Sequence, residues 1–221
     1  MSIRFVIGAD LDAGPFRPQA QIMLRFRLIH ALGGMALTLT ALIAPPNAAE
    51  GSIVQALALD ELVAQSDRIV VGEVVFAEAF IRADGTIATW YRVRVEQNLR
   101  GDPEDTNEVI VETMGGQIGD IGMRVEGEPS FSVGERTMIF MRDGGDATFR
   151  PVGMGQGVMR IRLEGRVEQV LPSRQGMMLV RRNARGALVK SNGPLVGKER
   201  LGTFLTRVRD IVQAQRVGAD E

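Results

Sequence analysis

Five carboxylates lie in or beside a glycine-rich stretch, residues 111–129, and they are side chains that could do chemistry. Paired carboxylates can perform acid–base hydrolysis without histidine, and carboxylate oxygens also bind Ca²⁺. No calcium-loop spacing of the D-x-D-x-D-G kind occurs, and the order of the residues defines no geometry. A carboxylate-dependent hydrolase or a Ca-binding envelope protein is therefore the alternative function. The five carboxylates are Glu112, Asp120, Glu126, Glu128 and Glu135.

The glycines of this stretch do not form a nucleotide-binding motif. They follow neither the G-x-G-x-x-G pattern nor that of a P-loop, which also needs a lysine. The residues that follow favour extended structure, so no helix N-terminus is expected to bind a phosphate. We expect these glycines, and those of "GMGQG" (153–157), to permit positive φ angles, bulges and close strand approach.

A third group of candidates lies on one face of an expected strand, residues 87–99. Trp90, Arg92 and Arg94 alternate there with apolar residues. They form a candidate binding stripe, which Arg160 and Arg162 could join; the competing interpretation is an ordinary solvated face. Tryptophan beside arginine also suits stacking on bases, but an exported chain with a net charge of −1 is the wrong context, so we expect no nucleic-acid partner.

The sequence has no cysteine and a single histidine, His30. If the segment that contains His30 is removed as a signal peptide, a Ser-His-Asp triad, a Cys-His pair and the usual zinc sites are all excluded. We therefore expect no catalytic residue of these kinds, no metal and no cofactor.

Residues 23–49 match a secretory signal peptide. Arg25 and Arg27 precede an apolar run, which Pro45 and Pro46 end, and small residues follow. The run is shorter than the roughly 20 residues that span a bilayer, and no later stretch is long and apolar enough to span one. We expect residues 1–22 to be a mis-annotated or disordered extension, and the mature protein to be periplasmic or secreted, with another exported or envelope protein as its partner.

The rest of the chain predicts a mainly β domain over residues 53–172. A short helix is expected in 53–67 and a hairpin in 68–99, with Asp84-Gly85 in its turn. Further strands are expected at 108–114, 136–142, 147–153, 157–164 and 166–171. Short strands separated by turns indicate an antiparallel sandwich or barrel.

Residues 173–221 are expected to form an irregular segment followed by an amphipathic helix at 197–216. In the irregular part, the basic run 181–190 is interpreted as a loop or hairpin. The apolar residues of the helix recur at helical spacing, so we expect that face to pack on the barrel. They are Leu201, Phe204, Leu205, Val208, Ile211 and Val212.

Residues 56–163 resemble a group of uncharacterised exported bacterial proteins. The resemblance is carried by "SDRIVVGEVV", "YRVRVEQNLRGD" and "FRPVGMGQGVMRI", and by a G-x-P-x-F-x-x-G-E motif at residues 127–135. The first two segments are also similar to the netrin-like module of the tissue inhibitors of metalloproteinases, which implies an OB-type barrel with a helix. The N-terminal cysteine with which those inhibitors chelate zinc has no counterpart here. The leading hypothesis is a non-enzymatic binding or interaction module.

Overall fold

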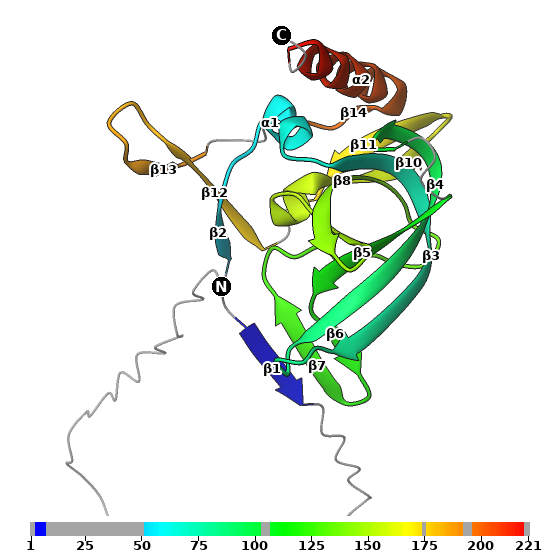
Figure 1. Cartoon of the computed structure of the whole chain (residues 1–221). Coiled ribbons are helices and arrows are strands. Elements are labelled where there is room, and N and C mark those ends of the chain that lie inside the picture. The colour runs from blue at the N-terminus through cyan, green and yellow to red at the C-terminus, as the bar shows by residue number, and fades with distance from the viewer. Residues whose placement is uncertain (1–2, 8–50, 103–106, 174–175, 192–195, 219–221) are drawn as a thin grey trace, which may run out of the picture. The chain divides into compact units, whose positions relative to one another are not determined.

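The computed structural model describes residues 3–7, 51–102, 107–173, 176–191 and 196–218 (Figure 1). The described chain is mainly β-strand, with a short helix α1 (Leu59–Ala64), a 3-10 helix η1 (Met154–Gly157) and a C-terminal helix α2 (Leu201–Val217). The predicted mainly β class with two helices is confirmed. The expected signal peptide, residues 23–49, lies outside the described residues.

Five strands close on themselves through backbone pairing. In order around this ring they are β3 (Arg68–Ile81), β4 (Ile87–Arg100), β5 (Glu108–Met114), β9 (Thr148–Pro151) and β8 (Arg136–Gly145), which pairs again with β3. All neighbours are antiparallel except β5 and β9, which are parallel. The expectation of a wholly antiparallel sheet was wrong here, because a closed ring with an odd number of strands must contain at least one parallel pair.

Further strands extend this sheet or form two small ones. Beyond β8 the large sheet continues through β10 (Val158–Glu164), β11 (Val167–Pro172) and β14 (Glu199–Arg200). One small sheet contains β1 (Ile3–Ile7), β7 (Ile121–Val125) and β6 (Gly116–Ile118). The other contains β13 (Leu188–Lys190), β12 (Met177–Arg182) and β2 (Ser52–Gln55), so the basic run 181–190 lies in a hairpin within the segment that we expected to be irregular.

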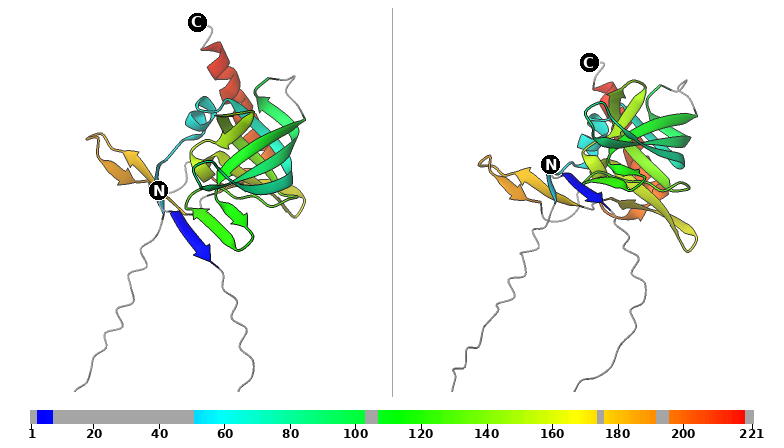
Figure 2. Two further views of the ribbon diagram at one scale, coloured as in Figure 1. Left: turned by 60° about the horizontal axis from the view of Figure 1, so that its bottom comes forward. Right: turned by 90° about the horizontal axis from the view of Figure 1, so that it is seen from below.

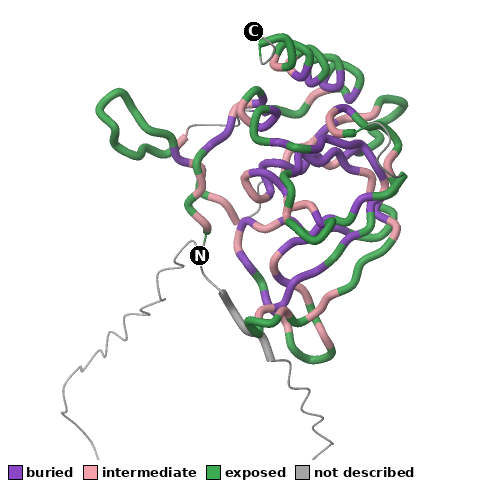
Figure 3. Tube along the Cα trace, viewed as in Figure 1, coloured by how far each residue is buried: buried purple, intermediate pink, exposed green. Residues whose placement is uncertain are grey.

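Two apolar cores lie on opposite faces of the large sheet. Val93, Val111 and Ile139 belong to a core formed by alternate residues inside the ring. Outside it, Phe140 packs with Phe204 and the rest of the apolar face of α2. Figure 3 shows that buried and exposed positions alternate along this helix. The predicted packing of the C-terminal helix is thus confirmed, although that helix begins at Leu201 rather than at residue 197.

The helix expected in residues 53–67 is shorter than predicted. Residues 52–55 form β2, which pairs in parallel with β12, and only residues 59–64 are helical. Tertiary pairing overrides the local helix propensity of this segment. The helix starts where the backbone N–H of Ala58 donates a hydrogen bond of 2.6 Å to Oε2 of Glu61, which provides part of an N-terminal cap.

Candidate functional site

A row of charged and aromatic side chains runs across the outer face of the ring. Glu78 of β3 is paired with Trp90 of β4, and Trp90 is paired with Glu112 of β5. Glu112 contacts Arg150 of β9, which is paired with Arg142 of β8. These residues alternate along their strands with the buried residues inside the ring, so the row faces outward.

Glu112 is the centre of this row. Its Oε2 accepts a hydrogen bond of 2.9 Å from Nε1 of Trp90, and its Oε1 accepts one of 2.9 Å from Nη2 of Arg150. Nη1 of Arg82 lies 3.1 Å from the same Oε1. Glu112 is only 8% exposed, and both of its oxygens are occupied. It therefore positions Arg150 and is not available as a free acid or base.

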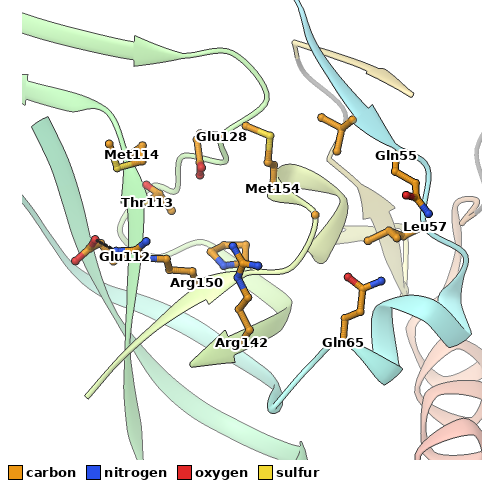
Figure 4. Close-up of a pocket in the computed structure, with 13 residues that line it drawn as sticks. Gln55, Leu57, Gln65, Glu112, Thr113, Met114, Glu128, Arg142, Arg150 and Met154 are labelled. Carbon is orange, nitrogen blue, oxygen red and sulfur yellow. Dashed lines mark hydrogen bonds and ion pairs between the residues drawn. The ribbon is translucent and has the colours of Figure 1, made fainter. Parts of the chain in front are cut away.

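The row ends at a pocket of about 360 Å³, a size that suits a small ligand (Figure 4). One wall comes from β2 and the segment after it, another from β5, and the floor from β8 and β9. The lining residues are Val54, Gln55, Leu57, Gln65, Glu112, Thr113, Met114, Glu128, Arg142, Arg150, Pro151, Gly153 and Met154.

Arg142 and Glu128 are the two charged groups of the pocket that Glu112 does not engage. Figure 4 shows the guanidinium of Arg142 and the carboxylate of Glu128 pointing toward one another across the pocket. Arg142 is exposed and makes no hydrogen bond or ion pair with any residue that the structure describes. Its guanidinium is therefore available to an anion that enters the pocket.

Burial raises the pKa of Glu128 from 4.5 to about 6. A hydrogen bond from the backbone amide of Met114 and the positive charges of Arg150 and Arg142 oppose this rise without cancelling it. The pocket therefore changes charge between weakly acidic and neutral pH: with Glu128 protonated, the positive charge of Arg142 is no longer offset by this carboxylate.

The wall opposite Glu128 is held by one buried glutamine. Oε1 of Gln156 accepts a hydrogen bond of 3.0 Å from the backbone N–H of Leu57, and its Nε2 donates one of 2.9 Å to the carbonyl oxygen of Gln55. Gly153, just before η1, has a φ of 61°, and a Cβ there would lie 2.8 Å from Cδ1 of Leu57. Gly153 thus has a positive φ angle, as predicted for the "GMGQG" segment, and its close approach to Leu57 shapes the pocket.

All three residues of the predicted stripe are exposed on one face of β4. Trp90 packs against Phe80 with ring centroids 4.2 Å apart. Arg92 lies 3.6 Å from a carboxylate of Glu108, and Arg94 donates a hydrogen bond of 2.5 Å to Glu73. The arginines of the stripe are therefore already paired with carboxylates, whereas Trp90 is connected to the pocket through Glu112.

Arg160 does not join the stripe. On the neighbouring strand β8, Arg160 is paired with Thr137. The residue before Thr137, Arg136, is paired with Glu73, which is itself paired with Arg94 of the stripe, so Arg136 lies on the face that carries the stripe. Consecutive residues of a strand point to opposite faces, so Arg160 lies on the other face, where it forms an ion pair with Glu135. Arg162, two residues further along the same strand, also lies on that face.

The five carboxylates of the sequence analysis do not form one cluster. Only Glu112 and Glu128 line this pocket, while Glu126 shares a second, adjacent pocket with Glu128. Within the described ranges, no three Asp, Glu, His or Cys side chains are grouped to hold a metal ion. Sequence reasoning missed Arg142 and Arg150, although they lie in two consecutive strands that it predicted, 136–142 and 147–153. Those bounds pair Arg142 with Ala147, whereas in the structure β8 extends to Gly145, the turn lies at Asp146 and Ala147, and Arg142 is paired with Arg150.

A comparison with known proteins found no matching protein family and no matching curated sequence. In the part of the chain that the structure describes, no helix is both long and apolar enough to cross a bilayer.

Proposed function

We propose that this protein is an exported, non-enzymatic binding module that takes a small organic carboxylate with an apolar body into the pocket beside Arg142. The observation that carries the proposal is the guanidinium of Arg142, which lines the pocket opposite Arg150 and has no hydrogen-bonding partner among the described residues. The guanidinium fork of arginine matches a carboxylate and binds it through two hydrogen bonds. Leu57, Met114 and Met154 provide apolar surface for the rest of the ligand.

The connectivity of the ring supports an OB-like assignment for this fold. In chain order its strands are β3, β4, β5, β8 and β9, and OB-type barrels bind ligands on the face of the second and third strands and in the loops beside it. The row that contains Trp90 and Glu112 lies on β4 and β5, and Arg142 and Arg150 lie beside the turn between β8 and β9. The pocket thus occupies the region that this type of barrel uses.

A binding function is favoured over a carboxylate-dependent hydrolase by the state of Glu112. In a pair of carboxylates that performs acid–base catalysis, one group donates a proton to the substrate and the other acts as base or nucleophile, so both must reach the substrate. Both oxygens of Glu112 accept hydrogen bonds or ion pairs from the protein, which leaves Glu128 alone in the pocket.

The export part of the proposal is based on residues 23–49, whose pattern matches a secretory signal peptide. Mass spectrometry of the protein recovered from the secreted and envelope fractions tests it. We expect a chain that starts at Glu50, and recovery of the intact chain from the cytoplasm alone would contradict export.

Ligand binding is tested with hexanoate, and hexanol serves as the neutral control. Trp90 is the single tryptophan of the chain, so its fluorescence reports directly on the row beside the pocket. We expect hexanoate to change this fluorescence saturably and to raise the melting temperature, since a ligand that binds only the native state stabilises it. Hexanol should do neither.

Variants assign the effect to the pocket. We expect Arg142→Gln to weaken hexanoate binding by about tenfold or more, the range of a charge-assisted hydrogen bond. Arg166→Gln, which removes an exposed arginine from the turn between β10 and β11, should leave the affinity unchanged. No saturable response to hexanoate, or equal binding by the Arg142→Gln variant, would overturn the proposal.

A further inference from the structure

One edge of the β6–β7 hairpin carries a strand from a distant part of the chain. Residues 3–7 form β1, which pairs antiparallel with β7 from Ile3 opposite Val125 to Ile7 opposite Ile121 (Figure 2). β7 pairs with β6 along its other edge. A chain from which residues 1–49 had been cleaved would therefore leave this edge of β7 without β1.

We propose that the outer edge of β7 is a docking site for an extended segment of a partner protein with an apolar–acidic–apolar pattern. Unpaired strand edges present backbone N–H and C=O groups that accept another strand, and peptide recognition by strand addition uses such edges. The pairing of β1 with all five residues of β7 shows that this edge accommodates a strand along its whole length. This site is independent of Arg142 and goes beyond the function proposed above.

The neighbours of Arg124 on β7 determine which residues fit on either side of the acidic one. Met123 and Val125 are buried in an apolar cluster with Ile87. Residues opposite each other on paired strands lie on the same face of the sheet, so partner residues opposite Met123 and Val125 face this cluster. Apolar residues are therefore favoured at both positions.

Arg124 favours the acidic residue between them. Its side chain is 70% exposed and forms an ion pair of 2.7 Å with Glu126 on the same segment, and its register partner on β1 is Arg4. Like charges directly opposite each other destabilise a strand pair, whereas opposite charges stabilise it. A partner with Glu or Asp opposite Arg124 therefore adds a second carboxylate beside this guanidinium and fits the edge better than a partner with a basic residue there.

Synthetic peptides test the proposal on the full chain carrying Arg4→Pro and Val6→Pro, which removes two backbone N–H groups of β1 and disfavours its pairing with β7. The probes are fluorescein-labelled Ile-Glu-Phe-Val-Ile, Ile-Arg-Phe-Val-Ile and a copy of the first with prolines at its third and fourth positions. We expect anisotropy to show that the Glu peptide binds roughly fivefold more tightly than the Arg peptide, and that the proline peptide does not bind. Arg124→Glu should reverse the order of the first two peptides, while Arg142→Gln should not change it.

Hydrogen exchange in the intact chain provides a second readout that requires no vacant edge. Arg4→Glu should slow exchange of the β7 amides relative to the unsubstituted chain, and Arg4→Pro with Val6→Pro should accelerate it. Equal binding of all three peptides, no binding of any, or a preference that Arg124→Glu leaves unchanged would overturn the proposal. Equal exchange rates of the β7 amides in the Arg4→Glu variant and in the unsubstituted chain would also overturn it.

Discussion

Arg142 of β8 lies directly opposite Arg150 of β9 in the antiparallel register of their hairpin. Two arginines in this position repel each other, and such a pair normally costs a few tenths of a kcal/mol up to about 1 kcal/mol. Of these two arginines, only Arg150 is engaged by Glu112. When Glu128 is protonated, the positive charge of Arg142 is a local disadvantage for stability that an anionic ligand would remove.

The first prediction follows from this asymmetry between the two arginines. At pH 5, where Glu128 with its pKa of about 6 is mostly protonated, Arg142→Gln should leave the free energy of unfolding unchanged or raise it by up to about 1 kcal/mol, because it relieves repulsion. Arg150→Gln should lower it by about 1–3 kcal/mol, because Glu112 loses a charged partner. Urea denaturation measures both, and equal losses in the two variants would contradict the assigned pairing.

Trp90 should stabilise the fold partly through its indole N–H. Trp90→Phe keeps an aromatic ring beside Phe80 but removes the hydrogen bond to Glu112, and it should lower the free energy of unfolding by about 1 kcal/mol. In a Glu112→Gln background the same substitution should cost less, since the charged acceptor is already lost. A double-mutant cycle followed by circular dichroism measures this coupling; additive losses would show that the indole N–H does not act through Glu112.

Glu128 should make both stability and ligand affinity depend on pH. Its pKa is about 6 in the folded chain against an ordinary value of 4.5, so between these values the native state binds more protons than the unfolded state. The contribution of Glu128 to stability therefore falls as the pH rises from about 4.5 to 6 and does not return above it.

The same ionisation should weaken the binding of hexanoate, because an ionised Glu128 repels the carboxylate. Affinity should fall as the pH rises from 5.5 to 7.5, a range within which the pKa of Glu128 lies. Titrations at several pH values measure this, and Glu128→Gln should flatten the profile. An unchanged profile in that variant would assign the dependence to another group.

The C-terminal helix should be required for the stability of the whole domain. Phe204 is fully buried and makes an edge-to-face contact with Phe140, with ring centroids 6.4 Å apart. Phe204→Ala should lower the free energy of unfolding by about 3–5 kcal/mol. Thr203→Ala, on the exposed face of the same helix, should change it by less than about 0.5 kcal/mol. Similar values for the two variants would contradict the packing of α2.

Two glycines should respond to alanine in opposite directions. At Gly116 φ is 144°, and a Cβ would lie 2.4 Å from Oγ1 of buried Thr89, so Gly116→Ala should destabilise the fold by more than about 1 kcal/mol. Gly202 lies in α2, where an added Cβ would point into open space, and Gly202→Ala should stabilise by about 0.5–1 kcal/mol. Thermal melting of both variants measures this; a neutral Gly116→Ala would disprove the close approach to Thr89.

Several elements could be predicted from local pattern. Strands at 68–81 and 108–114 have the bounds that alternation and β-branched content indicated, and Asp84-Gly85 lies in the turn of the first hairpin. The apolar face of α2 was predicted residue by residue from its spacing. The segment 52–55 was not, because its strand depends on pairing with β12, more than a hundred residues along the chain.

The sequence by itself determined the long strands of the ring, the turn of the first hairpin and the buried face of the last helix, because periods of two and of 3.6 residues are properties of neighbouring positions. Only the tertiary structure decided that Glu112 meets Arg150, 38 residues away, and that Arg142 is left facing the pocket. The physical reason is that β5 and β9 become neighbours only when the five-stranded ring closes, and the register of that closure is set by packing inside the ring rather than by any local pattern.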